Sequence, residues 1–233
     1  MTTRDQSFWD VLSADDVAAL KPTAQRRFLP RGDVLLHRGD EVSTVYLPVT
    51  ADILNQVHSE DGGSIMTANV GREGVTGLAA FLAKQPIGWD LIVQVEGDAI
   101  AIPAPVFRAQ TERSPNLLAA LIRLTHFHQV ESAQNTLCTA RHTVQARVAR
   151  LLLELHGRTG KSEFDLTQEE ISARLGAQRT TVNTAWGNLA GQGAVRGSRG
   201  RVRLVDSQRL QQQACRCYAA LSSSRFWPLT STV

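Results

Sequence analysis

Hydrophobic positions follow two different patterns along this chain of 233 residues. Between about residues 26 and 107, short runs rich in Val, Ile and Leu alternate with glycines, which is typical of strands joined by tight turns. The runs that fit best are Asp33–Leu36, Thr44–Val49, Leu91–Val95 and Ala99–Ile102. The pattern predicts a small antiparallel barrel or jelly roll, preceded by a short helix that Ser13 caps.

Beyond Pro115 the pattern becomes helical, because neither glycine nor proline occurs again before Gly157. Apolar residues in the first part recur at spacings of three and four, like the contact face of a coiled coil. They are Val130, Ala133, Leu137, Ala140 and Val144. Dimerisation and packing on the chain's own domain explain this spacing equally well, since His128 and Glu131 interrupt any longer face. A second stripe predicts a core helix that ends before Gly157; it comprises Val148, Leu151, Leu152 and Leu155.

The segment that begins at Leu166 has the spacing of a helix-turn-helix. Thr167 and Glu170 form a capping box at a helix start, and Gly176 permits the positive φ that ends this helix. Ser172, Gly176 and Val182 fall where two steeply crossing helices must approach closely. The second helix is expected to bury one face, formed by Val182, Ala185 and Leu189, with Trp186 beside it.

The opposite face of the second helix is polar and suits the major groove of DNA. Candidate DNA-binding residues on this helix and at the start of the first are Thr167, Gln168, Gln178, Arg179, Thr180, Thr181, Asn183 and Thr184. A hairpin follows, in which Val202 and Leu204 alternate with Arg201 and Arg203. This alternation predicts one buried and one cationic face. We expect the hairpin to act as a wing whose Arg199 and Arg201 contact backbone phosphates.

Charge divides unevenly between the two parts. Residues 1–140 contain 11 Lys and Arg against 16 Asp and Glu, whereas residues 141–233 contain 14 against 6, and 13 of those 14 cations are arginine. Arginine suits phosphates and guanine edges. The C-terminal part is therefore predicted to bind double-stranded DNA in a salt-sensitive manner. A small-molecule-binding or protein-docking module is the alternative, and the net charge of +8 in this part argues against it.

This order of motifs resembles the CRP/FNR family of bacterial transcription regulators over nearly the whole chain. Gly32, the Arg38–Asp40 corner and the Val70–Leu78 segment are similar to the family's effector domain, and Ser114–Asn116 with the following helix to its dimerisation helix. The resemblance implies an α+β fold with three parts. Residues 1–112 would form a cyclic-nucleotide-binding-like antiparallel β-roll or jelly-roll sensor domain, 113–142 a dimerisation helix, and 143–233 a winged helix-turn-helix DNA-binding domain.

The resemblance also implies a homodimer on a palindromic operator, with a recognition helix at about residues 178–190. Arg179 matches the family's guanine-contacting arginine, and Thr181 matches its Thr or Ser. Thr180 and Thr184 stand where many members have Glu and a second Arg, so we expect an altered half-site. RNA polymerase would be a further partner if the protein activates transcription.

Familiar sensor chemistry is missing from the first part. The family's phosphate-binding cassette has a Gly-Glu step and a later Arg-Ser or Arg-Thr, but this chain has Gly77–Ala80 and Gln85–Asp90. Without the arginine, cyclic AMP would bury an unpaired phosphate charge. Cyclic AMP bound in the usual way is therefore not expected, and the effector is either unknown or absent.

Metal centres and cofactors are not expected either. No cysteine precedes Cys138, which excludes a cluster held by N-terminal cysteines. His126 and His128 point in different directions on a helix, and Cys215 and Cys217 are expected to diverge in the same way.

An enzyme and a membrane protein are also disfavoured. The sequence offers no nucleophile–base pair and no phosphate-binding loop, so no catalytic residues are assigned. The opening MTTRDQSFWD has no apolar core, and no apolar run is long enough to span a bilayer. We expect a cytoplasmic protein without a membrane partner.

Overall fold

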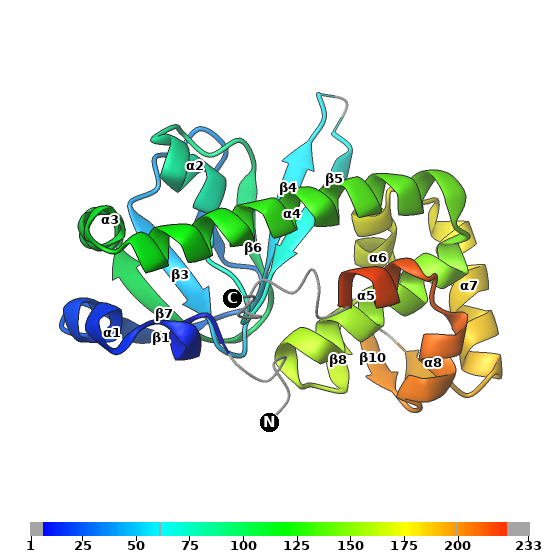
Figure 1. Cartoon of the computed structure of the whole chain (residues 1–233). Helices are drawn as coiled ribbons and strands as arrows, with labels where there is room; N and C mark the ends of the chain where they lie inside the picture. The colour runs from blue at the N-terminus through cyan, green and yellow to red at the C-terminus, as the bar shows by residue number, and fades with distance from the viewer. Residues whose placement is uncertain (1–6, 61, 199, 223–233) are drawn as a thin grey trace.

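The computed structural model describes residues 7–60, 62–198 and 200–222. An antiparallel β-roll and a winged helix occupy opposite ends of the molecule, and a long helix crosses from one to the other (Figure 1). The predicted α+β class is confirmed, with the β-roll, the long helix and the winged helix-turn-helix in the expected order.

The β-roll consists of two antiparallel sheets, with strand orders β1-β7-β3 and β2-β6-β4-β5. Their bounds are β1 (Gln25–Leu29), β2 (Val34–Leu36), β3 (Thr44–Pro48), β4 (Asp52–His58), β5 (Ser64–Val70), β6 (Asp90–Val95) and β7 (Gly97–Pro103). The four predicted runs correspond to β2, β3, β6 and β7. Strands β1, β4 and β5 were not predicted, because polar residues interrupt their apolar pattern, as Asn55 and Gln56 do in β4.

Short helices cover the roll. They are the 3-10 helix η1 (Trp9–Val11), α1 (Ala14–Leu20), α2 (Leu78–Ala83) and α3 (Ala104–Arg113). Ser13 caps α1 as predicted, since its Oγ accepts a hydrogen bond from the backbone N–H of Asp16 at 3.1 Å. Phe81 of α2 and Phe107 of α3 are fully buried, with ring centroids 5.4 Å apart.

The long helix α4 (Pro115–Arg141) has one buried and one exposed apolar face. The buried face packs against the roll and contains Leu117, Leu121, Leu124 and Phe127. Ala133 and Leu137 of the predicted contact face are exposed, and the exposed side continues through Ile122 to Leu118. The expected interruption by Glu131 is wrong, because this side chain is buried on the inner face. None of the helices within the described ranges combines the length and apolar character that crossing a membrane requires.

The winged helix begins directly after α4. Its elements are α5 (Val144–Thr159), β8 (Glu163–Asp165), α6 (Gln168–Leu175), α7 (Arg179–Gly191), β9 (Val195–Ser198) and β10 (Arg201–Leu204), followed by α8 (Ser207–Gln213) and α9 (Cys217–Ser222). The predicted end of α5 before Gly157 is wrong, because the helix continues to Thr159 and is capped by Gly160 at φ +71°. Val148, Leu152, Ile171 and Val182 lie in the core of this domain.

Candidate nucleic-acid interface

The first helix of the helix-turn-helix has the predicted ends. Thr167 Oγ1 accepts from the backbone N–H of Glu170 at 3.1 Å, and Glu170 Oε2 accepts from the backbone N–H of Thr167 at 2.7 Å. The capping box is therefore present. Gly176 ends α6 in the left-handed conformation at φ +55°. Ser172 is buried at the crossing and donates to the carbonyl of Gln168 at 2.7 Å.

The second helix, α7, has the predicted division between a buried and a polar face. Val182, Ala185 and Leu189 are its buried residues. The candidate residues of the polar face are all exposed; they are Gln178, Arg179, Thr180, Thr181, Asn183 and Thr184. Arg179 forms no ion pair with any residue that the structure describes, so its guanidinium is available to a ligand. Thr184 donates its hydroxyl proton to the carbonyl of Thr180 at 3.1 Å.

Strands β9 and β10 form the predicted hairpin. Val202 and Leu204 are buried, while Arg201 and Arg203 are exposed. A Cβ atom at Gly197 would overlap the carbonyl oxygen of Arg201, so this close strand approach requires glycine. Arg199 lies outside the described residues.

Carboxylates on β8 neutralise part of the wing, a pairing that was not predicted. Arg201 Nε lies 3.1 Å from Asp165 Oδ1, and Arg203 Nε lies 3.3 Å from Glu163 Oε1. Both pairs are exposed to solvent, where ion pairs are weak and exchange readily. DNA phosphates can therefore compete for these arginines.

Two surface hollows flank α7, each of about 350 Å³. One brings together four predicted residues from α6, α7 and the wing: Thr167, Gln168, Arg179 and Arg201. The other contains Thr180, Thr181 and Thr184, together with Thr143 at the start of α5. Gln178 and Asn183 line neither hollow.

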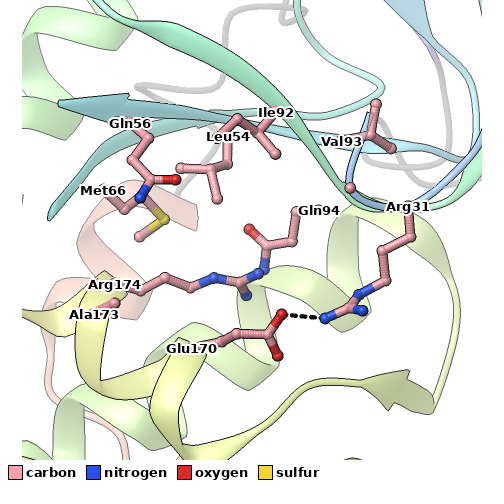
Figure 2. Close-up of a pocket in the computed structure, with 11 residues that line it drawn as sticks. Arg31, Leu54, Gln56, Met66, Ile92, Val93, Gln94, Glu170, Ala173 and Arg174 are labelled. Atoms are coloured by element: carbon pink, nitrogen blue, oxygen red, sulfur yellow. Dashed lines mark hydrogen bonds and ion pairs between the residues drawn. The ribbon is translucent and has the colours of Figure 1, made fainter. Parts of the chain in front are cut away.

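The other side of α6 contacts the β-roll, and this contact was not predicted. Arg31 of the roll forms an ion pair with Glu170, the same residue that caps α6. Beside the pair lies a cavity of about 160 Å³, lined by residues of the roll and of α6 (Figure 2). Gln94 of the roll and Arg174 of α6 line it, and Gln94 Nε2 and Arg174 Nη1 have no hydrogen-bond partner among the described residues. Burial lowers the pKa of Arg174 to about 10.

A buried ionic network joins the roll, α4 and α5. Arg158 of α5 donates from Nε to Glu73 of the roll at 2.9 Å and from Nη2 to Glu131 of α4 at 2.7 Å. Burial opposes ionisation of Glu131, but Arg158 and His128 together outweigh the effect of burial, and the pKa of this carboxyl is lowered to about 2. Burial also raises the pKa of Asp52 to about 7. In the sequence, the only sign of this network was the charged residue Arg158, which follows the apolar stripe of α5.

A second cluster joins the end of α4 to the last two described helices. Sulfur or nitrogen atoms of Cys138, His142, Cys215 and Cys217 all lie within 4.8 Å of one another. The expectation that Cys215 and Cys217 diverge on one helix is wrong, because α9 begins only at Cys217. The four-residue separation of Cys138 and His142 was a usable signal, since residues i and i+4 share a helix face.

Comparison with protein families finds both domain types in this chain. A cyclic nucleotide-binding domain model matches residues 26–114, and a Crp-like helix-turn-helix domain model matches residues 146–213. The two matches correspond to the β-roll and the winged helix and follow the same order.

Known proteins of similar organisation support the match. The CRP-like cAMP-activated global transcriptional regulator of Mycobacterium tuberculosis is 27% identical over 206 residues, which cover 85% of this chain and 92% of that protein. Transcriptional regulator SdrP of Thermus thermophilus is 25% identical over 191 residues, covering 78% and 91%.

Solved structures share the fold. FixK2 from Bradyrhizobium japonicum superposes with a TM-score of 0.69 at 19% identity, over 82% of this chain and 98% of that one. A regulator of the CRP/FNR family from Eubacterium rectale gives a TM-score of 0.67 at 19% identity, over 88% and 96%. With both domains matched in order, the chain belongs to the CRP/FNR family of bacterial transcription regulators.

Proposed function

We propose that this chain binds a palindromic operator as a homodimer, with α7 in the major groove and the β9–β10 hairpin on the phosphate backbone. The exposed polar face of α7, opposite its buried apolar face, carries this proposal. The basic composition of residues 141–233 supports it, because cations that displace counterions from DNA strengthen binding. In Figure 1, α7 lies at the end of the molecule farthest from α1 and α3, so the roll does not cover it.

Each candidate residue receives a role from its position. Arg179 reads guanine, because its guanidinium is exposed and has no ion-pair partner in the described chain. The threonines of α7 contact thymine methyl groups or phosphates; they are Thr180, Thr181 and Thr184. Gln178, the N-cap residue of α7, and Asn183 are further DNA contacts of the same exposed face. Thr167 and Gln168 at the start of α6 and Arg199 and Arg201 of the wing contact phosphates. Because the Thr184 hydroxyl proton is already donated to the carbonyl of Thr180, this side chain offers DNA an acceptor oxygen and a methyl group.

The exposed face of α4 forms the dimer contact in this proposal. Leu118, Ile122 and Leu137 are large hydrophobic side chains that the described chain leaves exposed. Apolar residues exposed along one helix face are stabilised by packing against a second copy. We accordingly propose a sensor domain over 1–112, a dimerisation helix over 113–142 and a DNA-binding domain over 143–233.

We propose that the roll does not bind cyclic AMP in the usual way. It responds to another effector or to none. The Mycobacterium tuberculosis relative is named as cAMP-activated. In this chain, Gln85–Asp90 contain no arginine for a cyclic phosphate, and Leu78, Phe81 and Ile87 of the same region are buried in the roll core. We further propose that the protein acts in the cytoplasm without catalysis, and that RNA polymerase is a partner if it activates transcription.

Selection of bound fragments from genomic DNA tests the proposed function. The full chain should enrich a palindrome whose half-sites lie about one helical turn apart. Arg179→Ala should abolish this enrichment, whereas Arg113→Ala, which removes an exposed arginine at the end of α3, should not. Failure to enrich any palindrome, or an unchanged operator affinity of Arg179→Ala, would contradict the proposal.

A further inference from the structure

Three cysteines and a histidine from separate segments meet at the point where α4 ends. Cys138 lies in the last turn of α4, and His142 is its C-cap residue, whose backbone N–H donates to the carbonyl of Cys138 at 3.1 Å. Cys215 lies between α8 and α9, and Cys217 begins α9. All three cysteines are buried and free of disulfides.

The distances within this cluster match those of a tetrahedral metal site. Cys138 Sγ lies 3.5 Å from Cys215 Sγ, and Cys217 Sγ lies 3.4 Å from His142 Nδ1. Zinc bound to sulfur at about 2.3 Å and to nitrogen at about 2.0 Å places neighbouring ligand atoms about 3.5 to 3.8 Å apart in a tetrahedron. With all four atoms within 4.8 Å of one another, only small side-chain shifts are needed for one ion to bind them all.

The surroundings of the cluster suit thiolate ligands. Gln134 donates from Nε2 to Cys217 Sγ at 2.9 Å. Arg147 and Arg150 of α5 are both buried and interact electrostatically with Cys138. Three thiolates and a neutral histidine around a divalent ion have a net charge of −1. Arg150 is already paired with Glu154 at 2.6 Å, so Arg147 provides the positive charge that balances the site. Such outer groups hold and tune metal ligands in known sites.

We propose that Cys138, His142, Cys215 and Cys217 bind one zinc ion or a similar thiophilic divalent cation. Three sulfur ligands and one histidine are a common donor set of structural zinc sites, and no position remains open for a substrate. The pattern is Cys-x3-His at the end of α4 and Cys-x-Cys at the start of α9.

The location gives the ion a mechanical role. His142 lies in the break between α4 and α5, where the dimerisation helix meets the DNA-binding domain. An ion bound there fastens the α8–α9 segment to α4 and fixes the direction in which the chain leaves α4. Metal occupancy therefore alters operator affinity, a consequence that rests on the proposed function, whereas the metal site itself does not.

Metal content of the full chain tests the site directly. Protein purified with reductant and without chelator should retain about one zinc per chain by elemental analysis. Replacement of zinc by cobalt should produce the strong sulfur-to-cobalt absorption and visible bands of a tetrahedral thiolate site. A chain that binds no metal, one whose cobalt spectrum lacks thiolate bands, or one isolated with a Cys138–Cys215 disulfide that excludes metal would overturn the proposal.

Variants separate this site from adventitious binding. Cys217→Ser and His142→Ala should each weaken zinc affinity by more than about 100-fold, because each removes a direct ligand. His126→Ala removes an exposed histidine of α4 that lies outside the cluster and should retain full affinity. If Cys217→Ser does not fold, the cobalt spectrum of the unaltered chain still decides. If His142→Ala and His126→Ala bind zinc with equal affinity, His142 is not a ligand of the ion.

DNA binding distinguishes the site from its consequence. Operator affinity of the chelated and zinc-reloaded chain should differ by at least about 5-fold. If the reloaded chain contains zinc and still binds the operator with the same affinity as the chelated chain, the regulatory role of the ion is overturned. If zinc binds but no palindrome is enriched, the proposed function fails and the metal site stands.

Discussion

Arg158 and Glu73 form a buried ion pair between the DNA-binding domain and the β-roll, with Arg158 Nε 2.9 Å from Glu73 Oε1. Glu131 of α4 accepts a second bond from the same guanidinium at 2.7 Å. One cation thus contacts all three parts of the chain. Arg72 adds a bond from Nε to the carbonyl of Arg158 at 2.7 Å. The Val70–Leu78 segment, which resembles the family's effector domain, is therefore in direct contact with α5.

Arg158→Leu should destabilise the protein strongly. It leaves the carboxylates of Glu73 and Glu131 buried without their cation, which typically costs about 3 to 5 kcal/mol. Urea unfolding followed by circular dichroism measures the loss. Arg26→Leu is the control, because it breaks an exposed pair with Asp98 and should cost less than about 1 kcal/mol. Similar losses in the two variants would show that the buried network does not stabilise the domain contact.

Asp52 should make stability fall as pH rises. Burial raises its folded-state pKa from 3.8 to about 7; Arg158 and Arg174 oppose this rise, and Glu73 adds to it. Because the pKa of Asp52 is higher in the folded than in the unfolded state, protonation of this carboxyl stabilises the fold. This stabilisation is fully present below about pH 4 and is lost as the pH rises through 7. The difference corresponds to about 4 kcal/mol.

Asp52→Asn should remove this dependence. The free energy of unfolding of the variant, relative to the unaltered chain, should increase between pH 5 and pH 8, and urea unfolding at each pH measures it. Asp33→Asn changes an exposed carboxyl of the same roll and should follow the unaltered chain. Parallel pH profiles for Asp52→Asn and the unaltered chain would refute the assignment.

The helix-turn-helix could be predicted from sequence because its signals are local. The capping box spans Thr167 to Glu170, and Gly176 ends α6 within the same short segment. The contacts that join the domains are not local. Arg158 and Glu73 are 85 positions apart, and Cys138 and Cys215 are 77 apart. No periodicity or spacing rule connects such positions, so the network and the cysteine cluster required the fold.

Strand β4 was not predicted because its polar residues are also explained only by a distant partner. Asp52 lies at its start and is fully buried, where it accepts a hydrogen bond from Asn69 of β5. A buried carboxylate in a strand contradicts the hydrophobic pattern on which strand prediction depends. Only the partner strand reveals why the polar residue is tolerated.

Ile122→Asp should dissociate the proposed dimer. Ile122 is 55% exposed on the outer face of α4, and a buried, unpaired carboxylate in a helix–helix contact is costly. Analytical ultracentrifugation should show a monomer at concentrations where the unaltered chain is a dimer. Val205→Asp is the matched control, because Val205 is 47% exposed but lies outside α4. Dimers of equal stability in both variants would exclude this face as the contact.

Asp165 should limit the contribution of the wing to DNA binding. Its carboxylate lies 3.1 Å from Arg201 Nε, so a phosphate must displace it before Arg201 can neutralise DNA charge. Arg201→Ala should lower the slope of log affinity against log salt by about 1, equally for operator and random DNA. Asp165→Asn should strengthen binding to both, since Arg201 no longer has an internal competitor. Glu112→Gln removes an exposed carboxyl of α3 and should leave both affinities unchanged. If Asp165→Asn and Glu112→Gln bind DNA equally, the wing arginine does not contact phosphate.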